Sequence, residues 1–209
     1  HRYSSAASDV YKRQDFAQQN VEVCVHLFFD TETSGLPRRW DAPASDVSNW
    51  PRLVQLGWIL TDENGTEQKR SCRIVAPEGF AISPGATRQH GITTEYALRH
   101  GEPLSETLEE FRSAVEEATD VVGHNVSFDL NVVGAEILRQ GWVNTLVTRR
   151  SICTMREGTE YCRIPGKYGY KWPTLTELHL KLFGTEFESA HDATVSYTHL
   201  RAHETSPDR

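Results

Sequence analysis

The feature that most constrains the fold is the run Val21–Phe29, VEVCVHLFF, which is almost continuously apolar and rich in β-branched residues. A run of this kind is typical of a central strand that is buried on both faces. It predicts a strand that ends at Asp30. A strand covered on both faces needs helices on both sides of its sheet, so we expect an α/β protein.

The segments that follow predict a mixed sheet in a single domain. Strands are expected at residues 52–61 and 68–75, and Asn64-Gly65 between them is a strong hairpin signal. These two strands and the first one would form an antiparallel meander. Shorter strands are expected at 120–123 and 151–155, and residues 156–171 are expected to be a polar surface excursion. Helices are expected at four places: 84–93, closed by Gly91; 105–117, with Ser105 as N-cap; 127–140; and 174–183, capped by Thr174.

Composition limits the classes of function. The 209 residues are 38% hydrophobic, which is enough for one core, and no apolar run is long enough to span a bilayer. The four cysteines form no CxxC pair and the start of the chain has no secretory signal, so a reduced, cytoplasmic protein is expected. The net charge of −7 argues against a protein that coats nucleic acid. It is compatible with a metal-dependent nuclease, in which cations bridge carboxylates to phosphate.

Two acids stand at the end of the first strand, in Phe28-Phe29-Asp30-Thr31-Glu32-Thr33-Ser34-Gly35. Side chains alternate in an extended segment, so Asp30 and Glu32 point to the same face. Their mutual repulsion favours a cation between them, and Mg²⁺ and Mn²⁺ prefer oxygen ligands. Gly35 is expected to allow a tight turn close to a substrate.

Two later segments carry residues suited to the same chemistry. Asp129 follows Gly123-His124-Asn125-Val126-Ser127-Phe128 at the start of an expected helix, where the helix dipole favours a carboxylate. His191 lies in Ser189-Ala190-His191-Asp192. An imidazole titrates near neutrality, so a histidine beside a metal site can accept a proton from water.

Together these motifs resemble the DEDDh branch of the DnaQ-like 3′→5′ exonucleases, over about residues 23–194. The resemblance implies a ribonuclease H-like fold and a two-metal phosphodiesterase that uses Mg²⁺ or Mn²⁺ to release nucleoside 5′-monophosphates from 3′ ends. It assigns Asp30, Glu32 and Asp129 to the metals and His191 to proton transfer. The substrate-binding residues it implies, together with those suggested by position, are Thr31, Thr33, Gly35, His90, Asn125 and Phe128.

The chain departs from the family pattern at one position. The family has an Asp five residues after the third-motif His, and this chain has Ser196 there. Reverse translation of residues 4–14 and 195–204 yields strings that resemble sequencing-library adapters. We therefore expect residues 1–14 and 195–209 to be adapter-derived and residues 15–194 to be a C-terminally truncated exonuclease domain. The chain as written is expected to be weakly active.

Several alternatives stay open from sequence alone. The substrate is expected to be DNA, and the setting proofreading or repair. The motifs are equally compatible with an oligoribonuclease-like or RNA-trimming enzyme. A non-catalytic nucleic-acid-binding module and a subunit docked on a DNA polymerase are further readings. The segment Pro37–Pro51 is expected to be a loop on the Asp30 side, in which Trp40 and Trp50 either pack as anchors or stack on bases.

Overall fold

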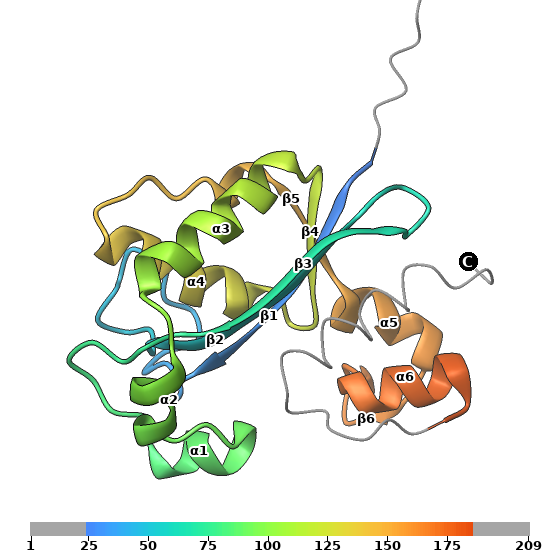
Figure 1. The fold of residues 1–209 in the computed structure, drawn as a ribbon. Coiled ribbons are helices and arrows are strands. Elements are labelled where there is room, and N and C mark those ends of the chain that lie inside the picture. Colours follow the sequence, from blue (N-terminus) through green and yellow to red (C-terminus); the bar gives the residue numbers. More distant parts are fainter. Residues whose placement is uncertain (1–23, 186–209) are drawn as a thin grey trace, which may run out of the picture.

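The computed structural model describes residues 24–185, which form a five-stranded sheet with the order β3-β2-β1-β4-β5 (Figure 1). The strands are β1 (His26–Thr33), β2 (Leu53–Thr61), β3 (Glu67–Ile74), β4 (Asp120–Gly123) and β5 (Arg150–Cys153). β1 pairs with β2 and β2 with β3 in antiparallel fashion, while β4 pairs in parallel with both β1 and β5. The predicted meander with added parallel strands is confirmed.

β1 is longer at its carboxyl end than the apolar run predicted. The expected end at Asp30 is wrong, because the ladder with β2 continues through Asp30↔Gly57, Thr31↔Leu56 and Glu32↔Gln55. Every residue of β2 is buried, so this strand supports β1 along its whole length. Both acids of the Asp30-Thr31-Glu32 triplet therefore lie in a regular strand and not in a loop.

Helices α3 (Leu104–Glu117) and α4 (Ser127–Arg139) cover one face of the sheet. Leu27 and Phe29 of β1 lie in the same buried cluster as Phe111 of α3 and Val133 of α4. Phe28, which alternates with these residues, packs instead with β4 and with the start of α6 (Leu175–Phe183). The central strand is thus covered on both faces, as its sequence predicted.

The remaining elements are short. They are α1 (Pro84–His90), α2 (Thr94–His100), the 3₁₀ turn η1 (Leu146–Thr148), α5 (Thr154–Cys162), and the paired strands β6 (Pro165–Gly166) and β7 (Gly169–Tyr170). Gly91 ends α1 in the left-handed conformation, as expected. Thr174 caps α6 in a full capping box with Glu177.

Two local expectations are wrong, and one helix was not expected. α3 begins at Leu104 after Pro103, so Ser105 is not its N-cap. The polar stretch after Met155 is not simply a surface excursion, because α5 occupies its first half. α2, capped by Thr93, was not expected at all. All four cysteines are free, and none of the helices in the described part of the chain is long and apolar enough to cross a membrane.

Candidate active site

The site forms where β1 extends past the end of β4. β4 pairs with β1 only from His26 to Phe28 and stops at Gly123. Beyond Phe28, the backbone of β1 on this edge needs acceptors other than a strand. The chain after β4 turns through Asn125, whose φ of 64° lies in the left-handed region that Asn tolerates. Helix α4 then begins beside the part of β1 that does not pair with β4.

This arrangement places Asp129, in the first turn of α4, against Thr31. One carboxylate oxygen, Oδ1 of Asp129, accepts hydrogen bonds from the Thr31 backbone N–H at 3.1 Å and from the Thr31 hydroxyl at 2.6 Å. Burial raises the pKa of the Asp129 carboxyl well above its usual range, and the charge of Asp30 raises it further, while the bonds from Thr31 oppose both effects. Asp30 therefore lies close enough to Asp129 for its charge to act on that carboxyl.

Glu32 borders a cavity of about 350 Å³ at the end of β1. Five of the six predicted substrate-binding residues line this cavity with it: Thr31, Thr33, Gly35, His90 and Phe128. Sequence reasoning missed the remaining lining residues, which are Leu36, Gly85, Ala86 and Gln89. The signal for one of them was available, because Ala86 lies one helical turn before His90 on the same face of α1.

His90 is held in a defined protonation state by its neighbours. Its Nε2 lies 3.2 Å from the carbonyl oxygen of Thr33, and its Nδ1 accepts the backbone N–H of Ile92 at 3.1 Å. Because a carbonyl only accepts, Nε2 carries the proton and the ring is neutral. Burial lowers the pKa of His90, with the bond to Thr33 opposing, which agrees with this assignment. His90 thereby ties α1 to the carboxyl end of β1.

Two of the predicted substrate-binding threonines have hydrogen-bond partners within the protein. The Thr31 hydroxyl is engaged with Asp129, and the Thr33 hydroxyl donates to the carbonyl of Gly35 at 2.7 Å. Gly35 is not among the positive-φ glycines, so the expected turn does not require glycine there. Asn125 does not line the cavity and instead forms the turn into α4.

The proposed metal and proton-transfer set is only partly described. His191 and Ser196 lie outside residues 24–185, as do both segments expected to be adapter-derived. Within residues 24–185, no three His, Cys, Asp or Glu side chains are grouped closely enough to hold a metal ion by themselves. The described part of the site is the Asp30–Asp129 pair, with Glu32 two residues further along β1.

The loop between β1 and β2 contributes an exposed aromatic ring next to this site. Trp40 is 60% exposed, and its ring centroid lies 5.7 Å from that of Phe128, which lines the cavity. Trp50 is only 3% exposed and donates from its indole nitrogen to the carbonyl of Pro43. The sequence did not distinguish the roles of the two tryptophans. In the structure, Trp50 is a buried anchor and Trp40 is an exposed ring.

The same loop is firmly attached to the domain. Asn49 bonds both the N–H and the carbonyl of Arg39, next to Trp40. Arg139 of α4 donates to the backbone carbonyls of Val47 and Trp50. These bonds hold the backbone of the loop that carries Trp40.

Comparison with protein families identifies an exonuclease family over most of the chain. The RNase_T family model, described as Exonuclease, matches residues 27–197. Among curated proteins, the PolC-type DNA polymerase III of Pediococcus pentosaceus is 27% identical over 175 residues, which are 80% of this chain and 10% of the polymerase.

Comparison with solved structures finds the same fold in E. coli exonuclease I. Its complex with a 5cy-dT13 oligonucleotide has a TM-score of 0.70 at 22% identity, covering 88% of this chain and 40% of the other. Its zinc-bound complex with single-stranded DNA gives 0.68 at 23% identity, with 88% and 40% coverage. This chain thus spans about two fifths of those proteins and about a tenth of the polymerase.

Proposed function

The chain belongs to the RNase_T exonuclease family, and on that premise we propose that it is a metal-dependent 3′→5′ exonuclease acting on single-stranded or frayed DNA ends. The predicted DnaQ-like family is confirmed by the match over residues 27–197. The proposal adds the direction of cleavage, the metals and the substrate. The observation that supports it is the interaction of Asp30 with the buried Asp129 at the carboxyl end of β1, where Glu32 follows two residues later and lines the adjoining cavity.

The side chains of this site suit hard divalent cations. The side chains of Asp30 and Asp129 offer only oxygen ligands to a metal, and their negative charges repel each other because Asp129 is buried. Glu32 follows on the same face of β1. We propose that these three acids hold two Mg²⁺ or Mn²⁺ ions. When bound, such ions would lower the pKa of an attacking water and neutralise the charge that develops on the phosphate.

The chain's own residues then position the reacting groups. The two bonds from Thr31 fix the carboxylate of Asp129 through one of its oxygens, Oδ1. We assign proton acceptance from the attacking water to His191, and nucleoside 5′-monophosphate as the product. Phe128 provides an apolar wall for the terminal nucleoside. His90 keeps the end of β1 in place through Thr33.

The relatives favour DNA over RNA. The E. coli exonuclease I structures contain DNA oligonucleotides, and the curated relative is a DNA polymerase. We propose single-stranded DNA as the substrate and proofreading or repair as the setting, with a polymerase as a partner. We place the protein in the cytoplasm, because its four cysteines are free and disulfides are rare in that compartment.

Ser196 supports a second candidate. If the fourth carboxylate is missing, the chain as written would bind nucleic acid and hydrolyse it poorly. We propose that it retains weak activity through Asp30, Glu32, Asp129 and His191.

A labelled-end assay tests the main proposal. A 20-nucleotide DNA labelled at its 5′ end should shorten stepwise with Mg²⁺ or Mn²⁺, releasing unlabelled mononucleotides first. Asp30→Asn should abolish this, whereas Glu63→Gln, an exposed acid in the β2–β3 turn, should not. Early release of the labelled nucleotide, or activity that survives Asp30→Asn, would overturn the proposal. An RNA of the same sequence tests the sugar preference.

A further inference from the structure

The segment Arg163–Trp172, RIPGKYGYKW, differs sharply in composition from the rest of the chain. It carries three basic and three aromatic residues, and no acidic residue lies between Glu160 and Glu177. The whole chain has a net charge of −7. Basic residues interleaved with aromatic ones are the combination that binds single-stranded nucleic acid, by neutralising phosphates and stacking on bases.

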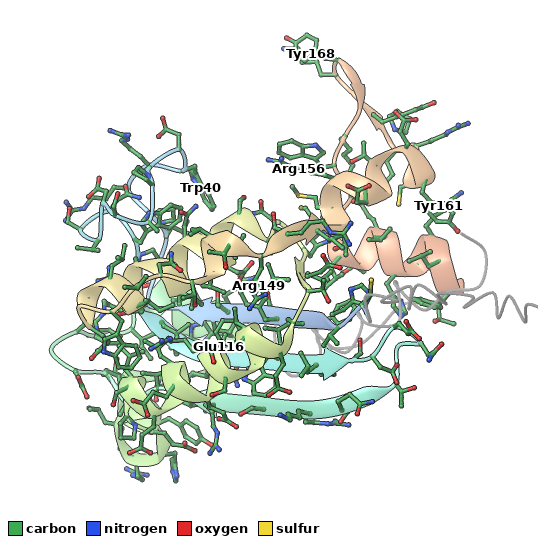
Figure 2. All side chains as sticks on the ribbon, turned by 90° about the horizontal axis from the view of Figure 1, so that it is seen from above. Trp40, Glu116, Arg149, Arg156, Tyr161 and Tyr168 are labelled. Atoms are coloured by element: carbon green, nitrogen blue, oxygen red, sulfur yellow. The ribbon has the colours of Figure 1, made fainter. Side chains whose placement is uncertain are left out.

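This segment folds as the hairpin of β6 and β7, which projects away from the sheet with Tyr168 at its tip (Figure 2). Tyr168 is 91% exposed, Trp172 60% and Tyr170 47%. None of the three belongs to a buried cluster, so packing of the core does not explain them. Large exposed aromatic side chains that gather on one element indicate a binding surface.

The charges of the hairpin are only partly neutralised within the protein. Lys171 pairs with Glu177, with its Nζ 2.6 Å and 2.7 Å from the two carboxylate oxygens. Lys167 Nζ lies 5.0 Å from the centroid of the Tyr168 ring, and the Nε of Arg163 donates to the backbone carbonyl of Glu160. Arg163 and Lys167 therefore leave the hairpin with a net positive charge.

A histidine connects the base of this hairpin to the active site. His124, between β4 and α4, donates from Nε2 to the carbonyl of Pro173 at 3.1 Å, and its Nδ1 lies 3.1 Å from the hydroxyl of Thr154 at the start of α5. Trp172 immediately precedes Pro173. The same short segment that delivers Asp129 to the site therefore also fixes the position where the hairpin ends.

A second cavity lies beside the first turn of α4. It is bounded by that turn, the end of β5 and the start of α5, with Arg156 and Glu157 among its walls. Phe128, from the same turn of α4, lines the active-site cavity. A strand leaving the active site across this turn would reach Arg156 at the start of α5 and then the hairpin, which lies on the same side of the molecule as Trp40 (Figure 2).

We propose that Arg156 and the Arg163–Trp172 hairpin bind the single-stranded part of the substrate that lies 5′ of the nucleotide being removed. The inference rests on the proposed function, because it assumes that the active site holds a 3′ end. Tyr168, Tyr170 and Trp172 stack on bases, and Arg163 and Lys167 contact phosphates. The hairpin therefore sets affinity for longer strands and does not take part in hydrolysis.

The test compares the full chain with a Tyr168→Ala/Trp172→Ala double variant. Binding of a fluorescent 20-nucleotide dT strand is followed by anisotropy in EDTA, so that the readout does not depend on hydrolysis. Hydrolysis of the p-nitrophenyl ester of thymidine 5′-monophosphate, which has no upstream nucleotides, is measured separately with Mn²⁺. Tyr96→Ala is the matched control, because Tyr96 is a 48% exposed aromatic residue on α2.

We expect the double variant to weaken binding of the 20-mer about tenfold or more, with ester hydrolysis unchanged and the control like the unmodified chain. Equal affinity for the 20-mer in all three proteins would overturn the inference, as would an equal loss in the control. If the unmodified chain hydrolyses neither the ester nor the 5′-labelled DNA of the exonuclease assay, the proposed function fails, and the anisotropy comparison still decides the role of the hairpin.

Discussion

Thr31 donates both its backbone N–H and its hydroxyl to a single carboxylate oxygen of Asp129. The pair joins the part of β1 that extends past β4 to the first turn of α4, and it orients the acid on which the charge of Asp30 acts. Loss of the hydroxyl should therefore affect both stability and catalysis.

We predict that Thr31→Val lowers the free energy of unfolding by about 1–2 kcal/mol, because a buried hydrogen bond to a carboxylate is lost. It should also lower exonuclease activity, since the carboxylate is held less firmly. Thr31→Ser keeps the hydroxyl and should behave like the unmodified chain in urea unfolding and in turnover. A valine variant as active and stable as the serine variant would contradict the role given to this bond.

Asp129→Asn separates the structural and chemical roles of the same side chain. The amide oxygen still accepts both bonds from Thr31, so the melting temperature should stay within about 2 °C. Activity should fall by at least about 100-fold, because a charged metal ligand is replaced by a neutral one. A variant that melts normally and remains active would show that Asp129 is not a ligand.

Trp40 is predicted to contribute to substrate affinity from its position beside Phe128. Trp40→Ala should raise the KM for single-stranded DNA about tenfold with little change in kcat, because one stacking surface is lost. Trp40→Phe should recover most of the affinity. Urea unfolding should be unchanged, since the ring is exposed. An alanine variant with normal KM but reduced stability would instead make Trp40 a packing residue.

Stability should depend on pH through Asp120 of β4, whose carboxylate contacts His26 on β1 and Arg150 on β5. Its carboxylate accepts two bonds from Arg150 at 2.5 Å and 2.7 Å, and it lies 3.1 Å from Nδ1 of His26. The bonds from Arg150 hold the pKa of Asp120 below its usual 3.8, with burial opposing them. The stabilisation is complete above about pH 5 and is lost as the pH falls through 3.8 towards the lower folded-state pKa.

At pH 7, Asp120→Asn should therefore lower the free energy of unfolding by about 1–3 kcal/mol, so that the variant unfolds at a lower urea concentration than the unmodified chain. The difference should shrink between pH 5 and pH 3. Asp41→Asn, which removes a fully exposed partner of Arg39, serves as control and should show no such dependence. A difference for Asp120→Asn that stays constant with pH would refute this account.

Ser196→Asp tests the position at which the chain departs from its family. Supplying a fourth carboxylate should raise turnover about tenfold or more in Mg²⁺, because the second metal gains a charged ligand. Ser196→Asn provides a side chain of the same size without the charge and should not raise it. Equal activities of the two variants would show that the position does not bind metal.

The sequence by itself determined the sheet, the helices with clear periodicity and the identity of the acids. The apolar segment His26–Phe29 and the Asn64-Gly65 turn encode their structures locally, through apolar content and backbone preference. Thr174 likewise caps α6 as its side chain predicts. Local signals were weaker where packing decides: β1 continues to Thr33 because β2 pairs with it, and α3 starts at Leu104 without a side-chain cap.

The tertiary structure alone decided how the site residues are used. Periodicity places Asp30 and Glu32 on one face, but it cannot show that Asp129 is held by Thr31, since that contact depends on where β4 stops and α4 begins. Nor can it separate Trp40 from Trp50, because burial depends on the bonds from Arg139 and Asn49 that fix the loop. Such contacts join residues far apart in the chain, and only the packed fold brings them within hydrogen-bonding distance.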